Sequence, residues 1–327
     1  MAHSPSALRQ FLDRQLDENP PRAKSLCVSF LGDALACHGG AIWLGAIIEL
    51  LEPLGINERL LRTSVFRLVA QGWLQAERHG RRSLYQLSDQ GRRRTAHASQ
   101  RIYVGPAQTW DGDWTLVALP RLGNQGLSER TELRRELAWE GFAMIAPGLF
   151  AHPQADAHTA HEILDKLGIP DKALVLCARD LAGAGGLPIA SLAPQSWNLD
   201  DVASQYEEFI LRFAPLAELI EGDLDPADAF VARMLLLHTW RRIVLHDPML
   251  PVPMLPEPWP GHAARILCGQ LYWRLFNASE RHLEQIAGRD NERYTALSED
   301  VFGRFGGKPS HEPRSSSYAR GSTSVLR

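Results

Sequence analysis

The chain has 327 residues, of which 45% are hydrophobic, so we expect two or three domains with sizeable buried cores. Its four cysteines form no CxxC pair, and no apolar run reaches the roughly 20 residues of a membrane span, which argues against zinc fingers, disulfide frameworks and membrane proteins and favours a cytoplasmic location. The net charge of −3 is unevenly distributed, because residues 56–104 carry ten Lys and Arg against three Asp and Glu, a local basic block that suits a polyanionic partner or forms a solvated face.

Residues 1–103 contain a succession of helical segments followed by a basic hairpin. Apolar residues at helical spacing predict helices over 25–37, 42–51 and 58–71, with Asn57 as the N-cap of the third. Short strand-like segments at 73–76 and 83–87 flank a polar turn, and a basic helix over 88–101 follows. This order predicts a winged helix-turn-helix DNA-binding domain with a linker helix.

Residues 104–190 alternate between strands and helices. Strands are expected over 114–119, 142–145, 149–152 and 173–177, with helices over 129–140 and 159–167. The βαββαβ-like order predicts a ferredoxin-like α+β domain.

Residues 191–302 have mostly helical periodicity, interrupted by a proline-rich loop from Pro248 to Pro260. This predicts a helical C-terminal domain. Residues 303–327 are rich in Gly, Ser, Pro and Arg and nearly free of apolar side chains, so we expect a disordered tail. The predicted fold class of the whole chain is therefore α+β, with three domains and a tail.

The helix predicted over 58–71 has one apolar and one basic face. Leu61, Val65, Leu68 and Val69 form the apolar stripe, and the opposite side is rich in arginine. The major groove of DNA admits one α-helix, and guanidinium groups grip phosphates or guanine edges. The predicted DNA-binding residues are those of this basic face and of the hairpin tip, namely Arg59, Arg62, Thr63, Phe66, Arg67, Arg78, His79, Arg81 and Arg82. The alternative is an ordinary amphipathic helix with a solvated basic face.

Several stretches of the chain resemble the PaaX family of transcriptional repressors. They are residues 39–74 (GGAIWLGAIIELLEPLGINERLLRTSVFRLVAQGWL), Gly80–Tyr85, Trp110–Trp114, Asp247–Pro251 and Leu255–Arg265. The resemblance implies a central domain of Cas2-like topology, a homodimer on a palindromic double-stranded operator, and control of phenylacetate catabolism. It also implies phenylacetyl-CoA, or a related aryl-acyl-CoA, as the inducer, with no other cofactor.

An acyl-CoA effector needs arginines for its phosphates and aromatic rings for its adenine and aryl groups. Aromatic and cationic residues adjoin at two places in the C-terminal region, which makes Trp240, Arg241, Arg242, His246, Trp259 and Arg265 the predicted effector-binding residues. The alternative is that the tryptophans anchor the core and the arginines make structural ion pairs. His158 and His161 lie one helical turn apart but have no adjacent third ligand, so no metal site is predicted.

We therefore expect a DNA-binding repressor of an aromatic-acid operon, released from DNA by an aryl-acyl-CoA, and not an enzyme. No catalytic residues are predicted, since Asp111 and Asp113 precede the first central strand and do not end it as a Cas2-type nuclease aspartate does. One alternative is an acyl-CoA-processing enzyme with an accessory DNA-binding domain. Another is a protein-interaction module whose basic face is merely solvated.

Overall fold

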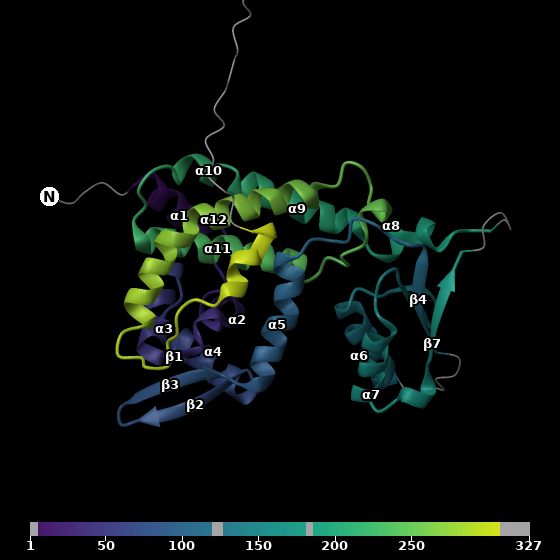
Figure 1. Ribbon diagram of the computed structural model, residues 1–327, viewed down its shortest axis with the longest axis horizontal. Coiled ribbons are helices and arrows are strands. Elements are labelled where there is room, and N and C mark those ends of the chain that lie inside the picture. The colour runs from purple at the N-terminus through teal and green to yellow at the C-terminus, as the bar shows by residue number, and fades with distance from the viewer. Residues whose placement is uncertain (1–5, 120–126, 181–185, 308–327) are drawn as a thin grey trace, which may run out of the picture.

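The computed structural model describes residues 6–119, 127–180 and 186–307. The molecule has two lobes (Figure 1). The larger lobe combines the N-terminal helices and hairpin with the long C-terminal helices, and the smaller lobe holds the central sheet with its two helices. The described part is mixed helix and sheet, as predicted.

In the first region, helices α2 to α4 are followed by a hairpin. Its elements are α1 (Ala7–Glu18), α2 (Ala23–Phe30), η1 (Leu31–Leu35), η2 (Ala36–His38), β1 (Ala41–Trp43), α3 (Leu44–Leu51), η3 (Glu52–Leu54), α4 (Glu58–Ala70), β2 (Leu74–His79), β3 (Arg82–Leu87) and α5 (Asp89–Tyr103). The three strands form an antiparallel sheet in the order β1-β3-β2.

Three features of this region differ from the prediction. The first predicted helix is present without a break but is not α-helical throughout, because its second half consists of the π-helical turn η1 and the 3-10 turn η2. Residues 41–43, of which Ile42 was expected to begin a helix, form β1 instead, where Ile42 pairs with Tyr85 of β3. The short helix α1 was not predicted, although Phe11 and Leu12 on one face are buried. In each case the structure that forms depends on packing against distant segments, which can override the local preference of the sequence.

The central region has the predicted βαββαβ order. Its elements are β4 (Asp113–Ala118), α6 (Leu127–Trp139), β5 (Ala143–Ala146), β6 (Leu149–His152), α7 (Ala157–Lys166), η5 (Pro170–Lys172) and β7 (Leu174–Arg179). All strand pairs are antiparallel, in the order β5-β6-β4-β7, which is the ferredoxin-like arrangement. Val117, Leu133 and Phe150 belong to a separate small core between the sheet and its helices.

The C-terminal region is helical, as predicted. It comprises η6 (Ile189–Leu192), α8 (Ala193–Ser196), α9 (Leu199–Phe213), α10 (Leu216–Leu219), α11 (Pro226–Val244), η7 (Val252–Met254), α12 (Pro260–Ala287) and η8 (Glu299–Gly306). The order of the chain extends beyond residue 302, where the tail was expected to begin, because Arg304 is buried and bonds to Asp33. Residues 308–327, the remainder of the predicted tail, lie outside the described residues.

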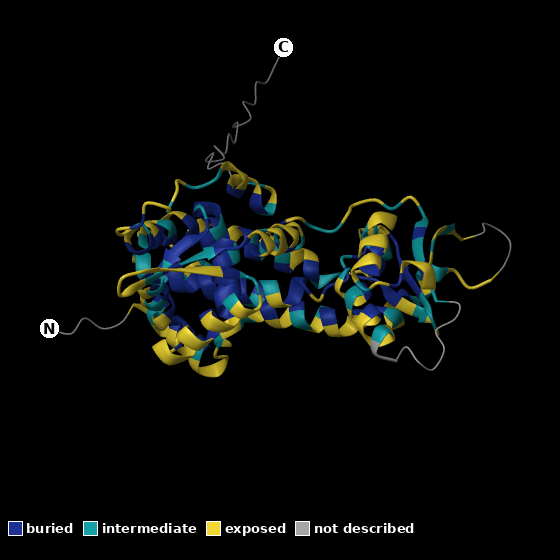
Figure 2. Ribbon diagram, turned by 90° about the horizontal axis from the view of Figure 1, so that it is seen from below, coloured by how far each residue is buried: buried dark blue, intermediate teal, exposed yellow. Residues whose placement is uncertain are grey.

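The first and third regions share one continuous hydrophobic core. Phe30 of α2 meets Phe230 of α11 edge to face, with ring centroids 6.4 Å apart. Buried residues run without interruption through the whole larger lobe (Figure 2). A smaller cluster containing Trp114, Trp197 and Leu250 joins this lobe to the central sheet. The chain thus leaves the larger lobe after α5, builds the central sheet, and returns.

Candidate nucleic-acid interface and effector cavities

Helix α4 presents a basic face because its start is capped and its apolar stripe is buried. The Asn57 side chain accepts a hydrogen bond from the Leu60 amide at 2.9 Å, which satisfies one of the free amides of the first turn. Leu61, Val65 and Leu68 pack into the core. All five residues predicted to contact DNA from this helix are exposed, namely Arg59, Arg62, Thr63, Phe66 and Arg67.

The exposed side chains of α4 differ in how firmly they are held. Arg62 forms an ion pair with Glu58 at 2.6 Å, and the Thr63 hydroxyl donates to the Arg59 carbonyl at 2.9 Å. Arg59 and Arg67 make no ion pair with any described residue. Phe66 is 73% exposed. Free guanidinium groups and an exposed ring suit contacts with a partner.

The hairpin turns tightly at Gly80, whose positive φ of 61° is easily adopted by glycine. Near the tip, His79 contacts Glu77 at 2.9 Å, and Arg78 donates to the Gly80 carbonyl at 3.2 Å. Arg81 is exposed and has no ion pair within the described ranges.

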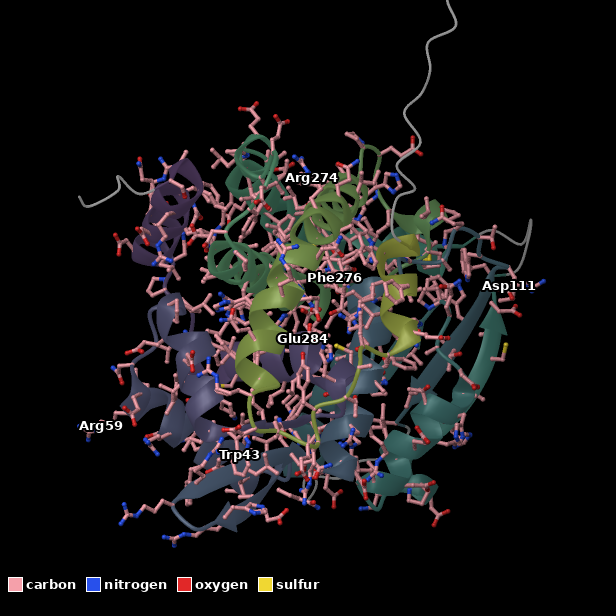
Figure 3. The ribbon with its side chains drawn as sticks, turned by 60° about the vertical axis from the view of Figure 1, so that its left-hand side comes forward. Trp43, Arg59, Asp111, Arg274, Phe276 and Glu284 are labelled. Carbon is pink, nitrogen blue, oxygen red and sulfur yellow. The ribbon has the colours of Figure 1, made fainter. Side chains whose placement is uncertain are left out.

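Arg82 is more firmly held than Arg81. Its guanidinium lies 4.2 Å from the centre of a Trp43 ring and 3.5 Å from the Asp290 carboxylate. Arg59 and the hairpin tip lie at the same end of the molecule (Figure 3). The two predicted basic elements are therefore positioned to contact one extended ligand.

A cavity of about 360 Å³ lies between these basic elements and the end of α12. Its lining includes four arginines and one acidic residue, Glu49; the arginines are Arg62, Arg81, Arg82 and Arg289. Such a concentration of guanidinium groups creates a positive potential suited to phosphate.

The segment of residues 288–298, which we name the strap, follows α12 and runs along the base of the hairpin. Asn291 donates from its side chain to the Ala41 carbonyl at 2.9 Å, and the Trp43 indole donates to the Asp290 carbonyl at 2.8 Å. Arg293 forms an ion pair with Glu77 at 2.8 Å. The C-terminal region therefore fixes the position of the hairpin, a connection that the sequence did not reveal.

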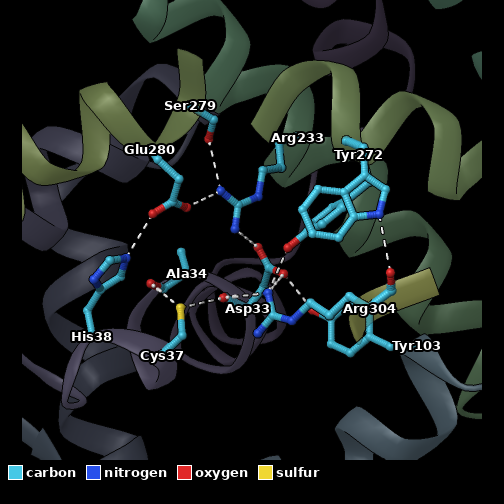
Figure 4. A network of polar contacts seen from close by, with 11 residues as sticks. Asp33, Ala34, Cys37, His38, Tyr103, Arg233, Tyr272, Ser279, Glu280 and Arg304 are labelled. Atoms are coloured by element: carbon cyan, nitrogen blue, oxygen red, sulfur yellow. Dashed lines mark hydrogen bonds and ion pairs between the residues drawn. The ribbon is translucent and has the colours of Figure 1, made fainter. Parts of the chain in front are cut away.

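A network of buried charges (Figure 4) contacts the strap through His38, whose ring lies 2.9 Å from the Thr295 carbonyl oxygen. Asp33, in the π-helical turn, contacts Arg233 of α11 at 2.8 Å and Arg304 of η8 at 2.9 Å. Arg233 also pairs with Glu280, which contacts His38 at 2.8 Å. Burial would raise the pKa of Glu280, but the charges of Arg233 and His38 dominate and lower it to about 2. The network joins the helices beside the hairpin to α11 and α12.

The six predicted effector residues do not gather in one place. Trp240 is fully buried and its indole donates to the Ile102 carbonyl at 2.9 Å, so it anchors the core. Arg241 lies beside a small space between α2 and α5. Arg242 and His246 line an open groove between α1, α9 and α11, whereas Trp259 and Arg265 line a different cavity.

We name the cavity lined by Trp259 and Arg265 the linker cavity, because residues 105–108, which link α5 to the central sheet, form one of its walls. Its volume is about 480 Å³. Trp259 meets Tyr206 edge to face, with ring centroids 6.0 Å apart. The Tyr206 hydroxyl donates to Asp247 at 2.5 Å, and burial raises the pKa of both groups. Tyr206 and Asp247 line this cavity and were not among the predicted effector-binding residues, although Asp247 lies in one of the stretches that carried the family resemblance.

The remaining sequence candidates have no developed site. The His158 side chain is 74% exposed and lies 3.3 Å from Glu162. Among the residues described, no three His, Cys, Asp or Glu side chains are grouped so as to hold a metal ion. None of the described helices combines the length and apolar character needed to cross a membrane.

Comparisons with known proteins cover nearly the whole chain. Family models match residues 22–91 (PaaX-like protein), 107–186 (PaaX protein central Cas2-like domain) and 197–285 (PaaX-like protein C-terminal domain). The transcriptional repressor PaaX of Escherichia coli strain K12 is 36% identical over 307 residues, which cover 92% of this chain and 96% of the relative. The uncharacterized protein Rv0674 from Mycobacterium tuberculosis has a similar fold, with a TM-score of 0.52, 23% identity, and coverage of 80% of this chain and 98% of that one.

Proposed function

The chain belongs to the PaaX family, and on that premise we propose that it is a DNA-binding transcriptional repressor of an aromatic-acid catabolic operon, that of phenylacetate. One observation carries the DNA-binding role: the exposed arginines of α4 and the basic hairpin tip lie at the same end of the molecule (Figure 3). As a member of a repressor family, the chain is a regulator and not an enzyme.

In this proposal, residues 1–103 act as a winged helix-turn-helix. Helix α4 enters the major groove, where its arginines contact base edges and phosphates, and the hairpin places Arg81 on the neighbouring backbone. Two protomers bind a palindromic operator, with one α4 in each of two successive major grooves. The interface is built for a polyanion, because Arg59, Arg67 and Arg81 have no ion pair among the described residues that DNA would need to displace.

The proposed effector is an aryl-acyl-CoA such as phenylacetyl-CoA. It would release the repressor by binding preferentially to a geometry of the dimer in which the two α4 helices no longer match the operator. A ligand shifts such an equilibrium only by its difference in affinity for the two states. The described cavities next to α5 provide places from which a ligand could act on the DNA-binding region.

The test is fluorescence anisotropy on DNA from upstream of the protein's own gene, comparing wild type with Arg59→Ala/Arg62→Ala. We expect operator affinity to fall at least about tenfold, since each specific contact contributes roughly 1–3 kcal/mol. The matched control is Arg134→Ala/Arg135→Ala on α6, which removes the same charge from two exposed positions and breaks the Arg135 pair with Glu132.

The same titration should include phenylacetyl-CoA and free phenylacetate. Release by the thioester alone supports the proposed effector. Wild-type affinity in the α4 double variant, with folding verified by circular dichroism, would refute the assignment of α4 as the recognition helix.

A further inference from the structure

We propose that the linker cavity is the site at which the aryl-acyl end of the effector binds. This inference rests on the proposed function, which supplies the effector class. The structure adds the location, the contacts and the route by which binding would reach the DNA-binding region.

The walls of the linker cavity suit a flat apolar group. Leu250, Val252, Leu255 and Pro258 provide aliphatic surface, and the rings of Tyr206 and Trp259 meet edge to face at one side. Aromatic rings favour edge-to-face or offset contacts with a third ring. The volume of about 480 Å³ lies within the range of small-molecule sites, which is roughly 300–1,000 Å³. An aryl-acyl group fits this space, while the nucleotide of a coenzyme A would lie outside.

The lining of the cavity also contains the polar residues Gln108, Asp247, Glu257, His262 and Arg265. Of these, Arg265 and Asp247 select the chemistry beside the ring. Arg265 is half-buried and forms no ion pair within the described part of the chain, and burial lowers its pKa. A ligand carbonyl would give this guanidinium an acceptor. The buried Asp247 carboxylate, held by Tyr206 and by the Met249 amide at 2.7 Å, disfavours a second anion nearby. The neutral carbonyl of a thioester therefore suits the cavity better than a free carboxylate.

The open groove between α1, α9 and α11 is the main rival site. It contains Arg14, Arg212 and Arg242, but Glu18, Asp201 and Glu208 lie in the same lining. Arg212 already donates to Gln15 at 2.6 Å. The groove is also about 1,000 Å³ and broadly open, so it offers a planar ring little enclosure.

The linker cavity is connected to the DNA-binding region through the end of α5. The Ile102 carbonyl receives hydrogen bonds from the Trp240 indole and, at 3.4 Å, from Arg265. Gly105 packs against Arg265, and the Val252 amide donates to the Ala107 carbonyl at 3.0 Å. A ligand that moves Arg265 or Val252 therefore acts on α5, whose other end follows directly from the hairpin.

The proposal is tested by substitutions that fill the linker cavity. Val252→Trp and Leu255→Trp are two independent variants, each of which places an indole ring where the ligand would lie. Ile266→Trp, at an exposed position beside Arg265 that does not line the cavity, is the matched control, and Leu211→Trp fills the rival groove. Binding of phenylacetyl-CoA, free phenylacetate and coenzyme A to each full-length variant is measured by calorimetry, and circular dichroism verifies folding.

We expect both filling variants to weaken phenylacetyl-CoA binding at least about tenfold, because overpacking a site costs roughly 1–3 kcal/mol. Ile266→Trp and Leu211→Trp should keep wild-type affinity for phenylacetyl-CoA and, without ligand, for the operator. If phenylacetate binds as tightly as phenylacetyl-CoA and is lost with the same variants, the cavity is supported as the site of the aryl ring, but the preference for a neutral carbonyl is overturned.

Unchanged binding in both filling variants, or loss only in Leu211→Trp, overturns the cavity assignment and leaves the proposed effector intact. If wild type binds none of the three compounds, both the cavity assignment and the proposed effector fail. The proposed DNA-binding role would still stand on its own anisotropy test.

Discussion

His152 and His238 are two buried histidines whose surroundings keep them neutral. Burial lowers the pKa of His238 to about 4, helped by the charges of Arg242 and Arg241. Burial likewise lowers the pKa of His152 to about 4, with a further contribution from Arg101. In an unfolded chain a histidine takes up its proton near pH 6.5. The folded state therefore binds fewer protons than the unfolded state between pH 6.5 and 4.

From this difference we predict that the free energy of unfolding falls as the pH is lowered from 6.5 to 4. Each histidine contributes a slope of at most about 1.4 kcal/mol per pH unit, because the unfolded chain gains a proton that the folded chain resists. Urea denaturation at several pH values measures it. His238→Asn, which keeps a group able to bond to Ser29, should reduce the slope, and His158→Asn at an exposed position should not. A slope unaffected by His238→Asn would contradict the assignment.

For individual residues, the sequence correctly predicted which side chains are exposed where helical periodicity determines the exposed face. Every proposed contact residue of α4 is exposed, because the spacing of Leu61, Val65 and Leu68 determines the opposite face. The ion pairs between buried charges could not be predicted from the sequence, because Asp33 pairs with Arg233, 200 residues away in the sequence, and with Arg304, 271 residues away. The effector set was grouped by adjacency in the sequence, whereas neighbouring residues on a helix point to different cavities.

Two adjacent arginines of the hairpin, Arg81 and Arg82, are held in different ways. Arg82 is fixed on Trp43 and beside Asp290 of the strap, while Arg81 has no ion pair in the described part of the protein. Arg82 therefore contributes to holding the hairpin in place, and Arg81 is available for a phosphate.

We predict that Arg81→Ala weakens DNA binding about equally on all sequences and reduces the slope of log K against log salt by about 1, as the loss of one phosphate contact does. Its unfolding free energy should stay within about 0.5 kcal/mol of wild type. In the matched variant Arg82→Ala, in contrast, the free energy of unfolding should fall by about 0.5–1 kcal/mol, because the substitution removes the contact with Trp43. An unchanged salt slope in Arg81→Ala would show that the hairpin tip does not reach the DNA backbone.

Elements were predicted well where the pattern is long and local, as in α4, α5 and the central βαββαβ order. Elements were not predicted where contacts with distant parts of the chain determine the secondary structure. Strand β1 has three residues and exists because it pairs with β3, and α1 buries Leu8, Phe11 and Leu12 in the core shared with the C-terminal helices. The strap has no regular pattern at all, yet its hydrogen bonds determine where the hairpin lies.

In the whole molecule, the N-terminal region, which we propose binds DNA, and the C-terminal helices share one hydrophobic core. The core of α2, α3 and α4 is completed by α11 and α12, and the buried charges of Figure 4 cross the same boundary. The central sheet, in contrast, has a core of its own.

We predict that a fragment of residues 1–104 lacks fixed tertiary structure. It would expose the apolar surface that α11 and α12 cover, and a buried Asp33 would lose its arginine partners. The fragment should bind ANS and show no near-ultraviolet circular dichroism, and a fragment of residues 191–307 should restore that signal when added. Cooperative unfolding of residues 1–104 alone would contradict a shared core.

The return of the chain to its starting lobe also has a consequence for synthesis. A polypeptide leaves the ribosome at roughly 5–20 residues per second, and domains ordinarily fold as they emerge. Here the region that is translated first cannot finish folding until Arg304, near the end of the chain, reaches Asp33. We therefore expect a translation product that stops before Arg304 to lack this ion pair and to leave the proposed DNA-binding surface unfinished.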